Sequence, residues 1–92
     1  MISTSARLRL ASKARLRFDR KATRYMLLYP EKGLVLNPTS AEILKLCTGE
    51  HTVAAIVAQL AEKYTKEAPE VEQEVVAFLR AMADRGLVQD VV

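Results

Sequence analysis

The stretch of sequence that decides the fold of this chain runs from residue 27 to residue 38 and reads LLYPEKGLVLNP. Two apolar runs flank a central Pro-Glu-Lys-Gly turn. Pro30 presets φ for a turn and Gly33 tolerates a positive φ, so the stretch predicts a β-hairpin. Asn37 is a suitable N-cap for a helix that starts at Pro38, because proline has no N–H to leave unpaired there. We therefore expect a hairpin that leads directly into a helix.

The neighbouring segments carry the patterns of further strands and helices. The run from 14 to 19 alternates polar and apolar residues with the period of two that marks a half-buried strand. Gly49 is expected to end the first helix in a left-handed conformation. The predicted strands are 14–19, 24–29 and 33–36, the predicted helices are 38–47, 53–64 and 69–85, and Leu87-Val88 is a short tail that pairs or packs. The predicted fold class is α+β, winged-helix-like, with a three-stranded antiparallel sheet followed by a three-helix bundle.

Length and composition indicate one small globular domain of 92 residues with an uneven charge distribution. Residues 1–24 contain eight basic residues and one acidic residue, a net charge of +7, whereas the remainder carries −4. A basic segment of this kind either steers acidic partners toward the protein or simply keeps it soluble. We expect a flexible basic N-terminal arm over 1–13 and a single winged-helix-like domain over 14–92.

The residue pattern offers little support for catalysis. Cys47 lies beside Ile43 and Leu44 on an apolar helical face, which is typical of a buried structural cysteine. A catalytic dyad with His51 is the less favoured alternative, and the two residues are too few for a structural zinc site. The sequence also has no Gly-rich phosphate loop and no run of about 18 apolar residues. We predict a protein that is not an enzyme, holds no metal or cofactor, does not span a membrane, and resides in the cytoplasm.

Six short motifs of the chain resemble the PqqD family. They are LRFD at 16–19, LLYPE at 27–31, LN at 36–37, ILKLCTG at 43–49, VVAFL at 75–79 and GLV at 86–88. The similarity covers nearly the whole chain from about residue 6 onward. Thr48, where the family often has Asp before the glycine, and Gln73-Glu74, where Asp commonly precedes the Val-Val pair, depart from the family pattern at surface or capping positions.

The resemblance implies a peptide chaperone that binds a ribosomally made precursor peptide, PqqA. It also implies presentation of that peptide to the radical SAM enzyme PqqE, which cross-links a Glu and a Tyr of the precursor on the way to pyrroloquinoline quinone. Related domains are leader-peptide recognition elements of peptide-modifying pathways. The chain lacks three cysteines for an iron–sulfur centre, which is consistent with leaving the chemistry to PqqE.

In that family the peptide lies as an added strand between the third strand and the third helix. The candidate peptide-binding residues are therefore Lys32, Leu34, Val35 and Leu36 on the strand, and Glu74, Phe78, Ala81, Met82 and Arg85 on the helix. The helix positions share one face that borders the core. Because strand side chains alternate, Val35 is expected to point away from Leu34 and Leu36.

A winged-helix DNA-binding protein is the alternative function. Its third helix would have to enter the major groove. The segment from 62 to 84 carries six acidic residues against three basic ones, which is the wrong sign for contact with phosphates. We therefore expect no nucleic-acid or membrane partner. A homodimer formed through exposed sheet edges is a further expectation.

Overall fold

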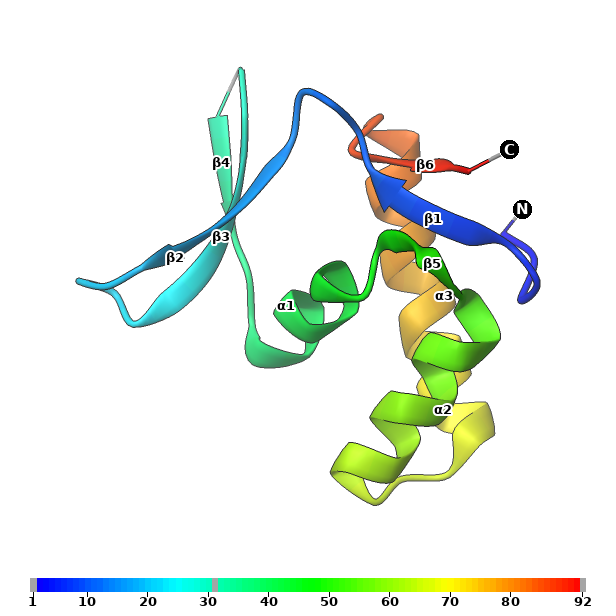
Figure 1. The fold of residues 1–92 in the computed structure, drawn as a ribbon. Helices are drawn as coiled ribbons and strands as arrows, with labels where there is room; N and C mark the ends of the chain where they lie inside the picture. The colour runs from blue at the N-terminus through cyan, green and yellow to red at the C-terminus, as the bar shows by residue number, and fades with distance from the viewer. Residues whose placement is uncertain (1, 31, 92) are drawn as a thin grey trace.

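The computed structural model describes residues 2–30 and 32–91, which form strands and helices in the order shown in Figure 1. The strands are β1 (Arg7–Leu10), β2 (Arg15–Asp19), β3 (Arg24–Tyr29), β4 (Lys32–Val35), β5 (Thr48–Thr52) and β6 (Val88–Asp90), and the helices are α1 (Pro38–Lys45), α2 (Val53–Tyr64) and α3 (Ala68–Asp84). All strand pairs are antiparallel. The α+β class is therefore confirmed, while the winged-helix detail stays a prediction. Within the described ranges, no helix is long and apolar enough to cross a membrane.

The predicted hairpin is formed by β3 and β4 and belongs to a three-stranded sheet in the order β2-β3-β4, with β3 at its centre and β4 at one edge. Glu31 of its turn lies outside the described residues. Gly33 lies inside β4 rather than in the turn, and its φ is outside the left-handed range, so the expected positive φ is wrong. A Cβ at Gly33 would lie only 3.0 Å from Met26 Cε and 3.1 Å from Leu28 Cδ2. A larger residue at this position would therefore require the ends of these two side chains of β3 to shift by a few tenths of an ångström.

A second three-stranded sheet, which the sequence analysis did not predict, joins the two ends of the chain. β1 lies at its centre, between β5 and β6. The flexible arm expected over 1–13 is therefore wrong for Arg7–Leu10, and Leu8 is only 3% exposed. Leu8 stands opposite Asp90 in the register. No local pattern shows that this segment pairs with a strand near the C-terminal end of the chain. Its basic residues therefore favour the prediction of a flexible arm.

The ends of the helices differ in part from those predicted. α1 ends at Lys45 and Thr48–Thr52 forms β5, so a helix that reaches residue 47 and is stopped by Gly49 is wrong. Gly49 does have a positive φ of 87°, but it lies where the pairing of β5 with β1 is irregular. α2 has the predicted bounds, and α3 starts and ends one residue before its predicted bounds.

The predicted cap at Asn37 is confirmed, and Thr52 caps α2 in the same way. The Asn37 side chain accepts a hydrogen bond from the Ser40 backbone N–H at 2.8 Å, and Pro38 is the first residue of α1. The Thr52 hydroxyl oxygen accepts one from the Ala55 N–H at 3.1 Å at the start of α2. Each cap joins a strand to a helix, β4 to α1 and β5 to α2, so the caps set how each helix leaves its sheet.

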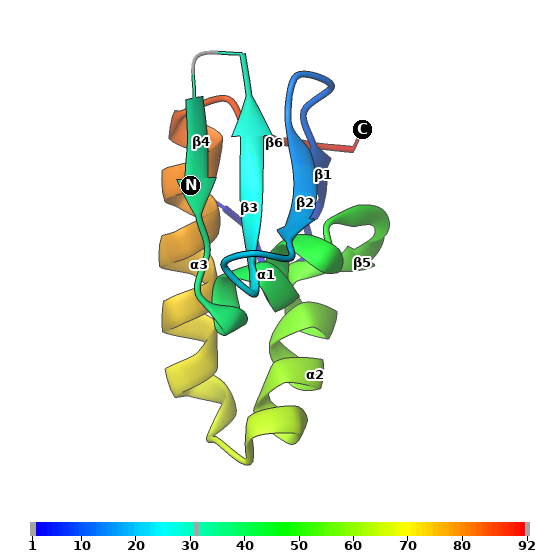
Figure 2. The same ribbon diagram turned by 90° about the vertical axis from the view of Figure 1, so that its left-hand side faces the viewer.

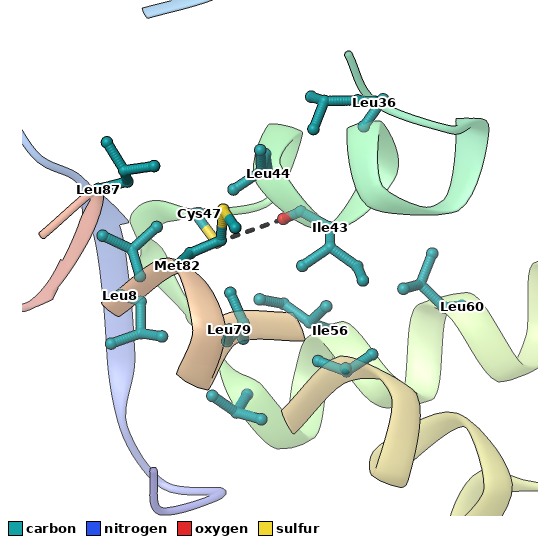
Figure 3. Close-up of a cluster of buried hydrophobic side chains, with 14 of the residues drawn as sticks. Leu8, Leu36, Ile43, Leu44, Cys47, Ile56, Leu60, Leu79, Met82 and Leu87 are labelled. Atoms are coloured by element: carbon teal, nitrogen blue, oxygen red, sulfur yellow. Dashed lines mark hydrogen bonds between the residues drawn. The ribbon is translucent and has the colours of Figure 1, made fainter. Parts of the chain in front are cut away.

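The buried side chains form one hydrophobic cluster to which all three helices and both sheets contribute. Figure 3 shows part of it, where Leu8 of β1, Cys47 and Met82 of α3 lie close to one another. The Cys47 thiol donates a hydrogen bond to the Ile43 carbonyl oxygen at 3.3 Å. Burial raises the pKa of the Cys47 thiol to about 12, so it is neutral and unreactive at ordinary pH. This agrees with its interpretation as a structural cysteine.

Candidate functional site

β4 is an edge strand, paired within the described residues with β3 alone. The Leu36 N–H donates to the Tyr25 carbonyl oxygen at 3.0 Å, which shows that residue 36 turns its peptide groups toward β3. In an antiparallel ladder, alternate residues turn these groups to opposite sides. Residue 34 therefore also faces β3, whereas the N–H and C=O groups of Gly33 and Val35 face away from it. Four backbone hydrogen-bonding groups are thus presented at the free edge of the sheet.

The two faces of this sheet differ in burial, as the register dictates. Leu16, Leu27 and Leu34 lie in one row on the inner face, where Leu27 is fully buried. Arg17, Met26 and Val35 form the neighbouring row on the outer face. Val35 is 52% exposed. The prediction that it points away from Leu34 and Leu36 is confirmed.

The candidate residues of α3 divide into a buried member and an exposed flank. Met82 belongs to the core, as does Leu36 at the end of β4. Each is only 4% exposed, so its side chain offers little surface to a ligand. Glu74, Ala81 and Arg85 are exposed and Phe78 is half-buried, and their spacing places all four along one flank of the helix.

The exposed strand residue Lys32 and the flank of α3 come from two separate parts of the fold. Figure 2 shows β4 in front of α3 on one side of the view, with β3 in the middle and β2 on the other, whereas Figure 1 shows that β4 stands apart from α3. An extended segment added to β4 would therefore continue the sheet on the α3 side of Figure 2, at a distance from the helix along the viewing direction. Whether the predicted strand and helix residues contact one ligand together stays a prediction.

The largest of three measured clefts lies at the other end of β4, between the sheet and α1. Its volume is about 710 Å³, and it is lined by Phe18, Thr23, Arg24, Tyr25, Val35, Leu36, Asn37, Pro38, Ala41, Glu42 and Lys45. Only Val35 and Leu36 of this set were predicted site residues. The alternation of β2 already places Phe18 on one face with Leu16, but the position of α1 across from it follows only from the tertiary fold.

Aromatic and charged groups are ordered on the walls of this cleft. The Phe18 and Tyr25 rings meet edge to face with centroids 5.0 Å apart, and Lys45 Nζ lies 4.2 Å from the Tyr25 ring centre. Glu42 forms ion pairs with Lys63 at 3.0 Å and with Lys45 at 3.4 Å. Tyr25, and after it Glu42, raise the pKa of Lys45, while Lys63 and then Lys45 lower that of Glu42. The Glu42 carboxylate is therefore already neutralised by two cations.

Known proteins resemble this chain along most of its length. The family model described as Coenzyme PQQ synthesis protein D (PqqD) matches residues 24–88. A protein of Rhodopseudomonas palustris (strain BisB5), named "PqqA binding protein", is 40% identical over 89 residues, which cover 97% of this chain and 87% of that protein. A protein of the same name from Methylococcus capsulatus (strain ATCC 33009 / NCIMB 11132 / Bath) is 34% identical over 85 residues, 92% of this chain and 89% of that protein.

The fold has a solved counterpart as well. It is the solution NMR structure of the PqqD truncation of Methylobacterium extorquens PqqCD, which represents a functional, stand-alone RiPP recognition element. The two structures superimpose with a TM-score of 0.83 at 29% sequence identity, covering 97% of this chain and 95% of the other. Sequence and fold agree on one family. The chain belongs to the PqqD family.

Proposed function

We propose that this chain binds the precursor peptide PqqA as an additional strand on β4 and presents it to the radical SAM enzyme PqqE. The names of its relatives and the recognition-element role of its structural counterpart support the first part. The observation that carries the proposal is the free edge of β4, where the peptide groups of Gly33 and Val35 face away from the sheet. An extended peptide can pair with this edge and extend the sheet by one strand.

The binding free energy from the backbone hydrogen bonds at this edge can be compared with the cost of ordering the peptide. Four backbone hydrogen bonds contribute about 0.5–1.5 kcal/mol each. Ordering a disordered segment on binding costs about 2–5 kcal/mol. The backbone alone therefore roughly offsets the ordering cost, and apolar side-chain burial must supply the affinity. Phe78 and Ala81 on the flank of α3 are the predicted apolar contacts, and Arg85 is the predicted partner of an acidic peptide side chain.

The decisive experiment is the substitution Val35→Pro. Proline lacks the N–H that faces the free edge, yet residues 34 and 36 keep their bonds to β3, and edge strands tolerate proline at such a position. We expect PqqA affinity, measured by calorimetry, to fall at least about tenfold, or about 1.4 kcal/mol. Val35→Thr keeps both the N–H and the branched shape, and we expect it to bind within about threefold of the unmodified protein. A folded Val35→Pro variant that binds PqqA normally would contradict strand addition.

Presentation to PqqE is tested by reconstitution. In the proposal the chain contributes recognition and PqqE contributes the chemistry, so the chain should accelerate cross-linking of PqqA without performing it. Mass spectrometry of PqqA after incubation with each protein alone and with both together measures this. Modified PqqA in the absence of PqqE, or no acceleration when both proteins are present, would contradict the proposal.

We also propose that two copies associate through the same free edge at high concentration, in the cytoplasm where PqqA is made. Unpaired edges favour pairing between chains. PqqA and the second copy would then compete for β4. Sedimentation should therefore show a concentration-dependent dimer that dissociates when PqqA is added, and a dimer that is unaffected by PqqA would place the contact elsewhere.

A further inference from the structure

We infer that the cleft between the β2–β3 turn and α1 is an anchor site for a peptide segment in which an apolar side chain, aromatic or branched, stands next to a carboxylate. The site is distinct from the flank of α3 and shares only the end of β4 with the strand-addition edge. The inference rests on the proposed function only in taking the ligand to be a peptide. It is carried by the exposure, shape and charge of the cleft.

Two exposed apolar residues line this cleft. Phe18 and Val35 are 44% and 52% exposed, the two highest values among the large hydrophobic residues of the described chain. They come from different edge strands of the same sheet, Phe18 on its inner face and Val35 on its outer face. Exposed apolar groups that gather in one concavity mark a binding site more often than scattered ones do. The cleft volume of about 710 Å³ leaves room for a side chain together with its flanking backbone.

The walls of the cleft are held in place before any ligand arrives. The Asn37 cap fixes the start of α1, and the bond from the Leu36 N–H to the Tyr25 carbonyl fixes the end of β4 against β3. Lys45 is positioned from two sides, by the Tyr25 ring and by Glu42. A preformed site loses less conformational freedom on binding than one that must be assembled. Phe18 and Lys45 can therefore act as fixed contacts.

The charge of the cleft favours a carboxylate. Arg24 and Lys45 both line it, and Arg24 forms no ion pair within the described part of the chain. Glu42 is the acidic residue of the lining, and Lys63 and Lys45 neutralise it. The adjoining cleft on the other side of Phe18 adds further basic residues, Arg17, Arg20 and Lys21, against Asp19. The surroundings are therefore net positive around an apolar centre.

The cleft continues from the strand-addition edge. Val35 lines the cleft and also presents its peptide groups at the free edge of β4. A peptide paired with the free edge of β4 therefore ends beside the segment from Leu36 to Pro38, which is one wall of the cleft, and a residue beyond that end can turn across this segment into the cleft. The anchor would fix the register of the peptide, since a one-residue shift along a strand moves every side chain to the other face.

The probe for this site is a set of blocked hexapeptides that contain Glu-Phe, Lys-Phe or Glu-Ala at the centre, titrated into the isotopically labelled protein. We expect NMR shifts of Thr23 and Ala41 with the Glu-Phe peptide up to about 5 mM, enough to saturate a site with a millimolar Kd. The Lys-Phe and Glu-Ala peptides should bind at least about fivefold more weakly. Absent shifts at these residues, equal binding of all three peptides, or equally tight binding of a short DNA duplex would overturn the inference.

Substitutions of cleft residues then test whether PqqA uses this site. Phe18→Ala should weaken PqqA binding at least about tenfold and Lys45→Gln about threefold to fivefold. The matched controls are Tyr64→Ala, an exposed aromatic on α2, and Lys13→Gln, an exposed lysine before β2; both should bind as the unmodified protein does. Unchanged PqqA affinity in a folded Phe18→Ala variant overturns the anchor while leaving strand addition intact. If the unmodified protein does not bind PqqA at all, the proposed function is wrong instead. The hexapeptide titration then still tests whether the cleft binds a peptide.

Discussion

The two sheets of this protein differ in how much of each is buried in the core and in whether an edge is left free. In β5-β1-β6, the central strand is covered on both edges, and Leu8 and Val88 are each 3% exposed. In β2-β3-β4, Leu27 is fully buried, but Phe18 and Val35 are exposed and β4 has a free edge. Figure 1 shows the first sheet beside α3 and the second projecting away from the helices.

The difference shows that one sequence pattern serves two purposes. β1 and β2 both alternate arginine with apolar residues, RLRL and RLRFD. In β1 the apolar residue Leu8 completes the core, so its burial stabilises the fold. In β2 the apolar residue Phe18 is 44% exposed beside the cleft, and it remains available to a ligand. Substitutions in the first sheet should therefore change stability, and those in the second should change binding.

The largest expected effect is on stability and comes from Leu8→Ala. Removing this buried side chain should lower the free energy of unfolding by about 2–5 kcal/mol, through lost burial and the cavity left behind. Urea unfolding followed by circular dichroism measures it. The substitution also tests the N-terminal strand directly, because a flexible arm at 1–13 would leave stability unchanged.

A matched pair of valines sharpens this contrast. Val88→Ala in β6 should cost about 1.5–2 kcal/mol of unfolding free energy, because two buried methyl groups are lost. Val35→Ala in β4 should change it by no more than about 0.5 kcal/mol, since the side chain is exposed. Equal losses at the two positions would break the distinction between the sheets.

Ala81→Asp tests how far the binding surface extends from β4 onto α3. An unpaired charge on the predicted groove flank should weaken PqqA binding at least about tenfold, or about 1.4 kcal/mol, while the fold survives. Ala83→Asp is the control, since Ala83 is also exposed near the end of α3 but lies on another side of the helix. Calorimetry on both folded variants measures the effect. Equal affinities would show that the α3 flank is not part of the groove.

The buried thiol of Cys47 predicts that the free energy of unfolding depends on pH. Its pKa is about 12 in the folded protein against 9.0 for an ordinary thiol, so the unfolded chain loses its proton first as pH rises. The stabilising contribution is therefore complete below pH 9 and is lost between pH 9 and 12. Unfolding free energy should fall by about 1.4 kcal/mol from pH 8 to pH 10. Urea titrations of the protein and of Cys47→Ala should differ in this slope, and identical slopes would contradict a buried thiol.

The smallest expected effects come from the two caps that follow the sheets. Asn37→Ala and Thr52→Ala should each cost about 1 kcal/mol of unfolding free energy, because each removes the partner of a helix N–H. Only Asn37 borders the cleft. Asn37→Ala should therefore also weaken binding of the Glu-Phe hexapeptide, whereas Thr52→Ala should not. If both caps affected binding alike, the change would reflect general stability rather than the cleft wall.

Local rules were sufficient for much of the fold. The hairpin, the Asn37 and Thr52 caps, the bounds of α2 and the outward direction of Val35 all follow from backbone periodicity and from hydrogen bonds a few residues apart. The resemblance of the motifs also identified the family. Those parts of the candidate site that lie along a single element, such as the free edge of β4 and the exposed flank of α3, were predictable for the same reason.

Tertiary structure decided what depends on residues far apart in the chain. Only the pairing of β1 with β5 and β6 shows that the N-terminal segment is a central strand, and only the packing of Met26 and Leu28 across Gly33 shows that a small residue suits that position. The cleft likewise needs α1 to lie opposite Phe18. Local patterns cannot specify such contacts, because an alternating strand has the same sequence whether its exposed groups meet a partner strand, a helix or solvent. Which of these it meets is settled by how the whole chain packs its apolar surface against itself.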